Sequence, residues 1–548
     1  MNSLKPMLLS SLKNYDKSQF VKDVTAGIIV AIIALPLSIA LALASGVGPE
    51  AGIFTAIVAG FVISALGGSS VQIAGPTAAF ATIVAGIVAH DGMDGLIVAT
   101  ILAGIFLILM GLCHFGSLIK FIPFTITTGF TSGIAVPIVL GQLKDFFGLT
   151  FPTGVKPIET VEKFEAVINN FSTINMDAVI VGVVSLAILI IAPYIFKRIP
   201  GSLLAVIAGI LMVQFLPLKV NTIGNLYTIS NALPTLHFPS LSLNMIQNAL
   251  PNALTIAVLA AIESLLSCVV ADGMINGKHR SDMELVAQGA GNIASALFGG
   301  IPATGAIART AANIKNGGRT PIAGMVHSIT LVIVLVVLMP YAGMIPMPTI
   351  AAILFIVAYN MCQWRTFVNL VKTAPKSDII VLVTSFVLTV IFDLVVAIEV
   401  GMVLACLLFI KRMSEETKVN GWTYVDDDTP DVDEHLQKLP LQIRVYEISG
   451  PLFFGAAGVI EEIAVKDFTT CLVLRMRSVP ALDSTALNAL KDLVQVCESK
   501  GITIVFSHVN DQPMKVMEKA GFIELVGEEN FQPSISAALD RAEEIIHK

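Results

Sequence analysis

Residues 73–89 read Ile-Ala-Gly-Pro-Thr-Ala-Ala-Phe-Ala-Thr-Ile-Val-Ala-Gly-Ile-Val-Ala, and residues 299–314 read Gly-Gly-Ile-Pro-Ala-Thr-Gly-Ala-Ile-Ala-Arg-Thr-Ala-Ala-Asn-Ile. In each, a stretch with Gly and Pro precedes a short apolar segment, Thr77–Ala89 in the first and Ala306–Ile314 in the second. A bilayer core takes about 20 apolar residues per straight helix, so neither segment is long enough to cross alone. Interrupted segments at matching places are typical of an inverted repeat with a central binding site.

Twelve longer apolar segments accompany the two short ones, at residues 24–44, 51–66, 96–112, 121–140, 178–195, 203–218, 253–270, 285–297, 325–338, 344–359, 379–391 and 394–410. The short segments are third and tenth in the series of fourteen, so each is third in a half of seven. Because seven is odd, the second half is predicted to be inverted in the membrane. Residues 24–412 are therefore predicted to form a polytopic α-helical transport domain, a 7+7 inverted repeat with two half-helices.

The composition fits a membrane protein. Hydrophobic residues make up 55% of the 548 residues, charged residues make up 13%, and the mean hydropathy is +0.82. Soluble domains carry about a quarter charged residues, so most of this chain is expected to face hydrocarbon. The net charge is −7 and no basic run predicts a nucleic-acid partner. We recognise no Ser/His/Asp grouping, metal cluster or phosphate loop, and therefore expect no enzyme activity, metal or cofactor.

The distribution of Lys and Arg predicts the orientation. If the N-terminal segment 1–23 is cytoplasmic, sixteen cations fall on inside segments and four on outside loops, at Lys144, Lys156, Lys163 and Lys219. Cytoplasmic loops carry an excess of Lys and Arg, so this ratio supports the number of spans. Both termini are then predicted to be cytoplasmic, and the lipid bilayer is expected to be a bacterial plasma or inner membrane.

After Arg412 the character of the chain changes. Residues 413–439, which include Asp426-Asp427-Asp428-Thr429-Pro430-Asp431, are predicted to form a polar linker. Residues 440–548 are predicted to form a small α/β domain, because apolar β-type segments alternate with helical patterns. The predicted strands are 441–448, 471–476 and 502–506, and the predicted helices are 455–465, 484–499 and 513–520.

Ser484 follows one of these strands and opens a helix. In one interpretation, Asp483 or Ser484 simply caps that helix. In the other, Ser484 is a phosphorylation site, since the helix dipole tolerates negative charge at this end. A cytoplasmic protein partner of the domain would then sense the modification.

The two half-helices predict the transport site. Helix N-termini present free backbone N–H groups and partial positive charge, so two facing N-termini suit a small anionic substrate. On the first half-helix we expect substrate contacts from Thr77, Ala78 and Ala79. On the second we expect them from Gly305, Ala306, Ile307, Ala308 and Arg309. The alternative for the small residues is close helix packing.

Glu263 and Arg309 lie within predicted spans, where a charge is costly and indicates function. Arg309 is expected to bind the substrate, to pair with Glu263, or to do both. Glu263 is predicted to load and release a coupling proton, with Ser267 one turn along on the same helical face. A purely structural ion pair is the alternative.

These residues resemble the SulP anion permease family along essentially the whole chain, with a STAS domain at the end. The matching motifs are GPTAAF at 75–80, GFTSG at 129–133, AIESLL at 261–266, ELVAQGAGN at 284–292 and ARTAAN at 308–313. The pattern looks closest to the bacterial C4-dicarboxylic acid transporter branch, on residues 272–274, 278–279 and 374–380.

The resemblance implies a core domain and a gate domain that move against each other, substrate between spans three and ten, and a homodimer. It also implies that Ser484 matches the phosphoserine of anti-sigma-factor antagonists. Cyanobacterial bicarbonate relatives use an Asp with sodium on span eight, where this chain has Glu263, so H⁺ is expected as the coupling ion rather than Na⁺. The expected function is proton-coupled uptake of a C4-dicarboxylate such as succinate, fumarate or aspartate. Sulfate or bicarbonate symport and an uncoupled anion channel are the alternatives.

Overall fold

The computed structural model describes residues 4–117, 122–152, 157, 159–196, 200–239, 242–392, 394–422, 439–461, 463 and 468–547. The chain divides into two compact units, Met1–Met402 and Val403–Lys548. The first unit is helical and the second is α/β. This order agrees with the predicted membrane domain and C-terminal domain.

Each of the fourteen predicted segments corresponds to a helix or to part of one. In chain order the helices are α2 (Lys17–Ala44), α3 (Pro49–Leu66), η2 (Ala78–Phe80) with α4 (Ala81–Leu112), α5 (Phe124–Phe147), α7 (Met176–Ile195), α8 (Gly201–Phe215), α10 (Leu243–Ile275), α11 (Ser281–Leu297), α12 (Ile307–Lys315), α13 (Ile322–Ala342), α14 (Met347–Cys362), α16 (Lys376–Ile391) and α17 (Leu394–Glu416). The helix α4 contains most of the predicted segment 77–89 and all of the segment 96–112. Gly92, with a φ of 70°, interrupts the helix between them. Eight helices of the described chain are long and apolar enough to cross a membrane.

The two interrupted segments meet through a short strand pair. The strand β1 (Ala74–Gly75) pairs antiparallel with β2 (Thr304–Gly305), with Ala74 opposite Gly305. The N–H of Ala306 also donates to the carbonyl of Ile73 at 2.9 Å. The third and tenth segments, more than 200 residues apart in sequence, therefore begin side by side.

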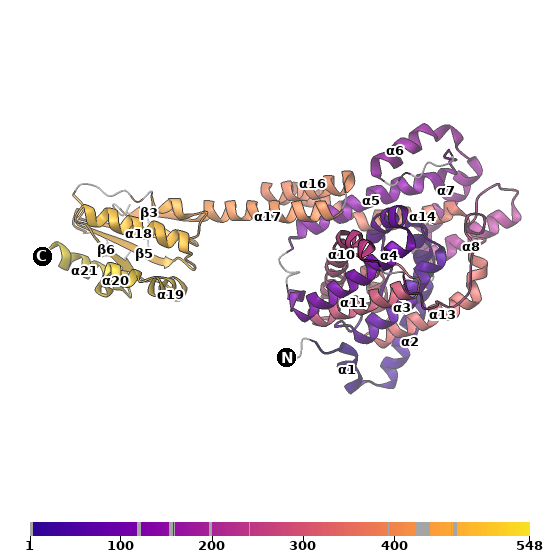
Figure 1. Ribbon diagram of the computed structural model, residues 1–548, viewed down its shortest axis with the longest axis horizontal. Helices are drawn as coiled ribbons and strands as arrows, with labels where there is room; N and C mark the ends of the chain where they lie inside the picture. The colour runs from indigo at the N-terminus through magenta and orange to yellow at the C-terminus, as the bar shows by residue number, and fades with distance from the viewer. Residues whose placement is uncertain are drawn as a thin grey trace. The chain divides into compact units, whose positions relative to one another are not determined.

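The helices α4, α10 and α11 pack together within the helical unit (Figure 1). A Cβ built on Gly104 of α4 would lie 2.6 Å from the Gly289 carbonyl oxygen of α11. Glycine at both positions lets the two helix backbones approach closely. This contact explains part of the 284–292 motif as packing.

Several short helices were not predicted from the sequence, namely α1 (Met7–Ser11), α6 (Thr160–Asn169), α9 (Ile223–Leu226) and α15 (Trp364–Thr373). They are too short or too polar to stand out as spans. The first predicted span was also placed too late, since α2 begins at Lys17 rather than Val24. The reason is a cap: Asp16 Oδ1 accepts a hydrogen bond from the Gln19 N–H at 2.8 Å.

The C-terminal unit contains a five-stranded sheet of order β3-β4-β5-β6-β7. The strands are β3 (Lys418–Trp422), β4 (Ile443–Ser449), β5 (Cys471–Ser478), β6 (Thr503–Ser507) and β7 (Phe531–Gln532). The first pair is antiparallel and the others are parallel. The helices α18 (Ser484–Ser499), α19 (Asp511–Lys519) and α20 (Phe522–Val526) contribute to the core on one face, and α21 (Ile535–Ile546) covers the other (Figure 1).

The described residues at the start of the predicted linker 413–439 have regular structure. Its first residues finish α17 and form β3, which pairs with β4. The prediction missed β3 because Asn420 and Gly421 weaken its strand pattern. The acidic stretch lies outside the described residues, which resume at Leu439. Of the predicted helix 455–465, the structure describes a 3-10 turn at Ala457–Ile460, and most of the residues after Glu461 are not described.

Candidate anion site between the half-helices

The half-helices begin directly after the β1–β2 pair. Their N-cap residues are Thr77 and Ala306, and neither makes a side-chain capping hydrogen bond. The first N–H groups of a helix have no partner within the helix, so both starts present free donors and partial positive charge. The structure thus brings the two N-termini together, as the sequence predicts.

The predicted contact residues differ in exposure. Ala78, Ala79 and Ala306 are buried, whereas Ile307 and Ala308 are exposed. Packing therefore accounts for the small side chains of the buried three. The first turn of α12 is less covered by protein, so its backbone is more accessible to a small ligand. Direct substrate contact by any of these residues stays a prediction.

Glu263 of α10 reaches the first half-helix. The Thr77 hydroxyl donates a hydrogen bond to Glu263 Oε2 at 2.9 Å, and both side chains are half-buried. A carboxylate that remains partly accessible, next to an N-terminus, can exchange a proton with the site. This placement fits the predicted neighbourhood of Glu263.

Arg309 forms no ion pair with Glu263 or with any other described residue. Its side chain is 4% exposed, and Nη2 donates to the carbonyl of Pro76. Nη1 has no hydrogen-bond partner in the described part of the chain. A Cβ on Gly75 would overlap the guanidinium, so glycine makes room for it. The structural ion pair is thus absent, and a full positive charge lies behind the start of the first half-helix.

Hydroxyl groups that the sequence analysis did not assign connect α10 to the strand pair. Ser264 Oγ lies 2.8 Å from Thr304 Oγ1 and accepts from the Gly305 N–H at 3.1 Å. Ser267, predicted to assist proton coupling, is buried and donates to Thr310 Oγ1 at 3.5 Å. Ser267 therefore contacts α12 rather than Glu263. Ser264 and Ser267 are three residues apart in the predicted span, so they lie on one face of the helix. This spacing could have predicted that both serines contact the same neighbouring segment.

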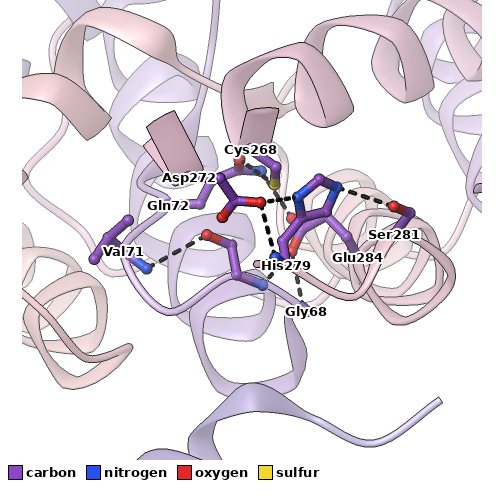
Figure 2. Close-up of polar contacts among 9 residues, drawn as sticks. Gly68, Val71, Gln72, Cys268, Asp272, His279, Ser281 and Glu284 are labelled. Atoms are coloured by element: carbon purple, nitrogen blue, oxygen red, sulfur yellow. Dashed lines mark hydrogen bonds and ion pairs between the residues drawn. The ribbon is translucent and has the colours of Figure 1, made fainter. Parts of the chain in front are cut away.

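A buried carboxylate fastens the segment that leads into β1. Glu284 of α11 has an exposed fraction of 0%. Its Oε2 accepts from the N–H groups of Gly68 at 2.9 Å and Ser69 at 3.1 Å. Its Oε1 accepts from Gln72 at 2.8 Å (Figure 2). The same oxygen accepts from Gln288 at 2.9 Å. Four donors satisfy this carboxylate, so it holds α11 and the 68–72 turn in one arrangement.

The structure also contains a Ser/His/Asp grouping that the sequence analysis did not recognise. His279 Nδ1 lies 2.7 Å from Asp272 Oδ2, and His279 Nε2 lies 2.9 Å from Ser281 Oγ (Figure 2). Asp272 Oδ2 also accepts from the His279 N–H at 2.9 Å. The grouping joins the end of α10 to the start of α11 across a short loop. Residues seven apart in sequence meet because Asn276, with a φ of 52°, reverses the chain.

In the C-terminal unit, the capping interpretation is confirmed for Asp483. Its Oδ1 accepts from the Ala486 N–H at 2.9 Å, and its Oδ2 accepts from the Phe454 N–H at 2.8 Å. Ser484 is the first residue of α18 and is exposed. Its phosphorylation stays a prediction.

Comparison with known proteins gives two family matches. The model described as "Sulfate permease family" matches residues 20–385, and the STAS domain model matches residues 437–538. Over 530 residues the chain is 38% identical to the "Putative sulfate transporter YvdB" of Bacillus subtilis, covering 95% of this chain and 97% of that protein. It is 31% identical to the bicarbonate transporter BicA of Picosynechococcus sp., covering 95% and 94%.

Solved structures agree with the fold. The structure of SLC26A9 superposes with a TM-score of 0.87 at 19% identity, covering 99% of this chain and 93% of that chain. The transmembrane domain of a cyanobacterial BicA gives a TM-score of 0.63 at 30% identity, covering 70% of this chain and 98% of that chain. The expectation of an inverted-repeat transporter fold followed by a STAS domain is thereby confirmed.

These comparisons bear on two further expectations. The expected C4-dicarboxylate branch has no support, because the relatives are sulfate and bicarbonate transporters. The expectation of a non-enzyme is confirmed, since the family and these relatives are transporters. The Asp272–His279–Ser281 grouping is therefore interpreted as a structural clasp between two helices.

Replacing Glu284 by Gln should destabilise the helical unit. An amide nitrogen in place of either oxygen would face two N–H donors, and each buried donor left without an acceptor costs about 1–3 kcal/mol. We expect a clear fall in the melting temperature of the detergent-solubilised protein, measured by size-exclusion chromatography after heating. The control is Glu415→Gln, at a side chain that is 67% exposed. Equal melting temperatures would contradict the role of Glu284 as the acceptor that holds these four donors.

Proposed function

Because this chain belongs to the sulfate permease family of anion transporters, we propose that it is a secondary transporter that binds a small oxyanion between the N-termini of η2–α4 and α12. The observation that carries the proposal is the meeting of two uncapped helix starts beside the buried Arg309 guanidinium. Each start contributes about half a positive charge. A guanidinium adds a full one, so the site favours an anion over a neutral or cationic solute.

Sulfate or bicarbonate is the favoured substrate. The named relatives at 38% and 31% identity are transporters of these two anions, and both ions are small enough to bind among alanine side chains. A C4-dicarboxylate carries the same double charge as sulfate but is longer. It has no support among these relatives and enters the proposal only as a competing substrate to be tested.

Glu263 is the coupling acid in this proposal, and the coupling ion is H⁺ rather than Na⁺. The carboxylate lies at hydrogen-bond distance from Thr77, at the start of the first half-helix. A proton that binds there would offset part of the charge of an incoming anion. Anion binding and proton binding would then favour each other, which is what symport requires. An uncoupled channel would not need this acid.

The substrate is tested in proteoliposomes with an imposed pH gradient, using labelled sulfate, bicarbonate and succinate in turn. We expect sulfate or bicarbonate to accumulate and succinate to remain at equilibrium. Arg309→Gln should lower uptake at least about tenfold, since a change of 1.4 kcal/mol in binding is already tenfold. The matched control is Arg319→Gln, whose guanidinium bonds to carbonyls at the far end of α12. Failure of the wild-type protein to accumulate any of the three anions would overturn the proposal.

Replacing Glu263 by Gln should abolish accumulation driven by the pH gradient, because an amide cannot carry the proton. The amide oxygen can still accept the Thr77 hydrogen bond, so the fold and anion exchange should survive. The measurement compares gradient-driven uptake with exchange of labelled for unlabelled anion. The control is Glu399→Gln, an exposed acid on α17. Wild-type accumulation by the Glu263 variant would show that another group carries the proton.

The proposal also includes an orientation and an assembly. Both termini are cytoplasmic, which accords with sixteen cations on inside segments against four outside. The chain acts in a bacterial plasma membrane as a homodimer. A cytoplasmic protein partner docks on the STAS domain, where the exposed Ser484 at the start of α18 is the candidate phosphorylation site.

Removing residues 417–548 should leave the order of preference among anions unchanged, because the half-helices lie wholly in the other unit. We expect less protein in the membrane or a lower turnover rate instead. Cutting after Glu416 also removes β3. The comparison variant is cut at Pro440 and keeps β3 without its partner β4, so it should aggregate more. A shortened protein that reaches the membrane but prefers a different anion would contradict this division of roles.

A further inference from the structure

The helical unit contains a cavity of about 490 Å³ whose lining includes neither Thr77–Phe80 nor Ala306–Arg309. The end of α2, the first half of α4, the second half of α5 and the short helix α6 form its walls. We call it the outer vestibule. The lining residues that matter here are Ala81, Thr82, Gln142, Lys144, Asp145 and Lys163.

The outer vestibule extends almost to the candidate anion site. Its deepest lining residue along α4 is Ala81, three residues after Ala78 at the start of η2. With a rise of about 1.5 Å per residue, the two are roughly one helical turn apart. From Ala81 the lining continues through Ala85 to Ala89, away from the N-terminus. The cavity therefore follows one face of the half-helix.

Lys163 places an uncompensated cation in this cavity. The side chain is half-buried and forms no ion pair with any described residue. A Cβ built on Gly141 would lie 4.0 Å from Lys163 Nζ, so the ammonium rests over bare backbone of α5. Burial lowers the pKa of Lys163, and the Glu162 carboxylate only opposes that shift. Removing an ammonium from water is costly unless a counter-charge binds beside it.

Other lining groups favour an anion as that counter-charge. Lys144 is the second cation, and its Nζ lies 5.1 Å from the centre of the Phe151 ring. Asp145 is the one acid among the lining residues given for the cavity, so the charge of the two lysines is only half offset. Gln142 is buried and makes no hydrogen bond within the described chain, which leaves its amide N–H groups free to donate.

The scarcity of cations at this end makes the two lysines notable. The orientation from loop charge assigns only Lys144, Lys156, Lys163 and Lys219 to the outer side. Two of these four line the outer vestibule. Lys156 lies outside the described residues. Most Lys and Arg residues of this chain are predicted on the cytoplasmic side, whereas two of the four predicted on the outer side line one cavity.

We propose that the outer vestibule is a second anion site, where a small oxyanion from the outer side binds between Lys144 and Lys163 before it reaches the half-helix N-termini. This inference rests on the proposed function for its direction of travel. Binding in the vestibule raises the local concentration of anion in a cavity whose lining begins about one helical turn from the transport site. The site recognises charge through two ammonium groups and one amide, so it accepts sulfate and bicarbonate alike.

The first test measures anion binding without transport. The full-length protein in nanodiscs of phosphatidylcholine is treated with a sulfonated N-hydroxysuccinimide ester, and modification of each lysine is followed by peptide mass spectrometry. Sulfate should slow modification of Lys163 at least about threefold, because a bound anion keeps the ammonium protonated and covers it. Gluconate at equal ionic strength serves as the solution control, and Lys219 is the internal control. Equal rates for Lys163 with sulfate and gluconate would overturn the proposal.

The phosphate of a lipid headgroup is the alternative anion that would bind the same two lysines. The measurement is therefore repeated with phosphatidylglycerol added to the nanodiscs. Slower modification of Lys163 in these nanodiscs, with no further effect of sulfate in either lipid, would assign the cavity to a lipid headgroup and overturn the proposal. Protection by sulfate in phosphatidylcholine alone supports it.

The second test uses vesicles of known orientation. Lys163→Gln should raise the half-saturating sulfate concentration at least about threefold from the outer side, because local attraction is lost. The value from the inner side and the maximal rate should not change. Lys163→Arg should retain the wild-type value, and Lys219→Gln is the matched control outside the cavity. An unchanged outer value in Lys163→Gln, beside active wild-type transport, overturns the vestibule and leaves the proposed function intact. If the wild-type protein moves no anion, the proposed function fails, and the labelling of Lys163 still decides whether the cavity binds one.

Discussion

A membrane interior offers no water to backbone N–H and C=O groups, so a helix that stops there must find partners for its ends within the protein. In this chain the strand pair β1–β2 provides them for the approach to both half-helices. The first N–H groups of η2 and α12 have no partner within their own helices, and the two helices begin beside the same strand pair. The strand pair that satisfies the backbone at these interruptions therefore also forms the candidate anion site. The pairing of Ala74 with Gly305 is the contact that brings the starts of the third and tenth segments together.

The charge of Arg309 depends on this arrangement and completes it. A buried guanidinium is tolerated where carbonyl groups and a counter-charge are near. Here one hydrogen bond goes to Pro76, and among the described residues Nη1 has no partner and no carboxylate pairs with the guanidinium. The missing counter-charge is the substrate in the proposed function. This explains why Glu263 bonds to Thr77 instead, since a permanent Glu263–Arg309 pair would cancel the field that attracts an anion.

The sequence predicted most of the fold, because spans and their interruptions are local features. Length, Gly and Pro identify the segments 77–89 and 306–314, and the alternation of loop charge fixes their number. The sequence could not predict contacts between segments that are far apart along the chain. The four donors around Glu284, the Asp272–His279–Ser281 clasp and the vestibule lysines meet only after folding. Ser267 was assigned to the proton site from helical period alone, and its actual partner Thr310 lies on another helix. The substrate branch failed for a different reason: its motifs at 272–274, 278–279 and 374–380 include none of the candidate site residues, and the named relatives are a putative sulfate transporter and a bicarbonate transporter.

A site built from backbone amides and helix dipoles recognises charge well and shape poorly. Peptide N–H groups are the same in every sequence, so a scaffold of this kind accepts sulfate in one relative and bicarbonate in another without a new fold. Discrimination must then come from side chains at the edge of the site. In this chain the accessible ones are Thr77, Ile307 and Ala308, with Glu263 behind them. Ile307 and Ala308 offer an apolar rim that binds no ligand oxygen, so in the proposed function the anion is held by the donors of the two helix starts and by the charge of Arg309. A compact tetrahedral or planar oxyanion can place all its oxygens among those donors, whereas a dicarboxylate would leave one carboxylate against the apolar rim. The proposed site would therefore favour a small oxyanion over a dicarboxylate.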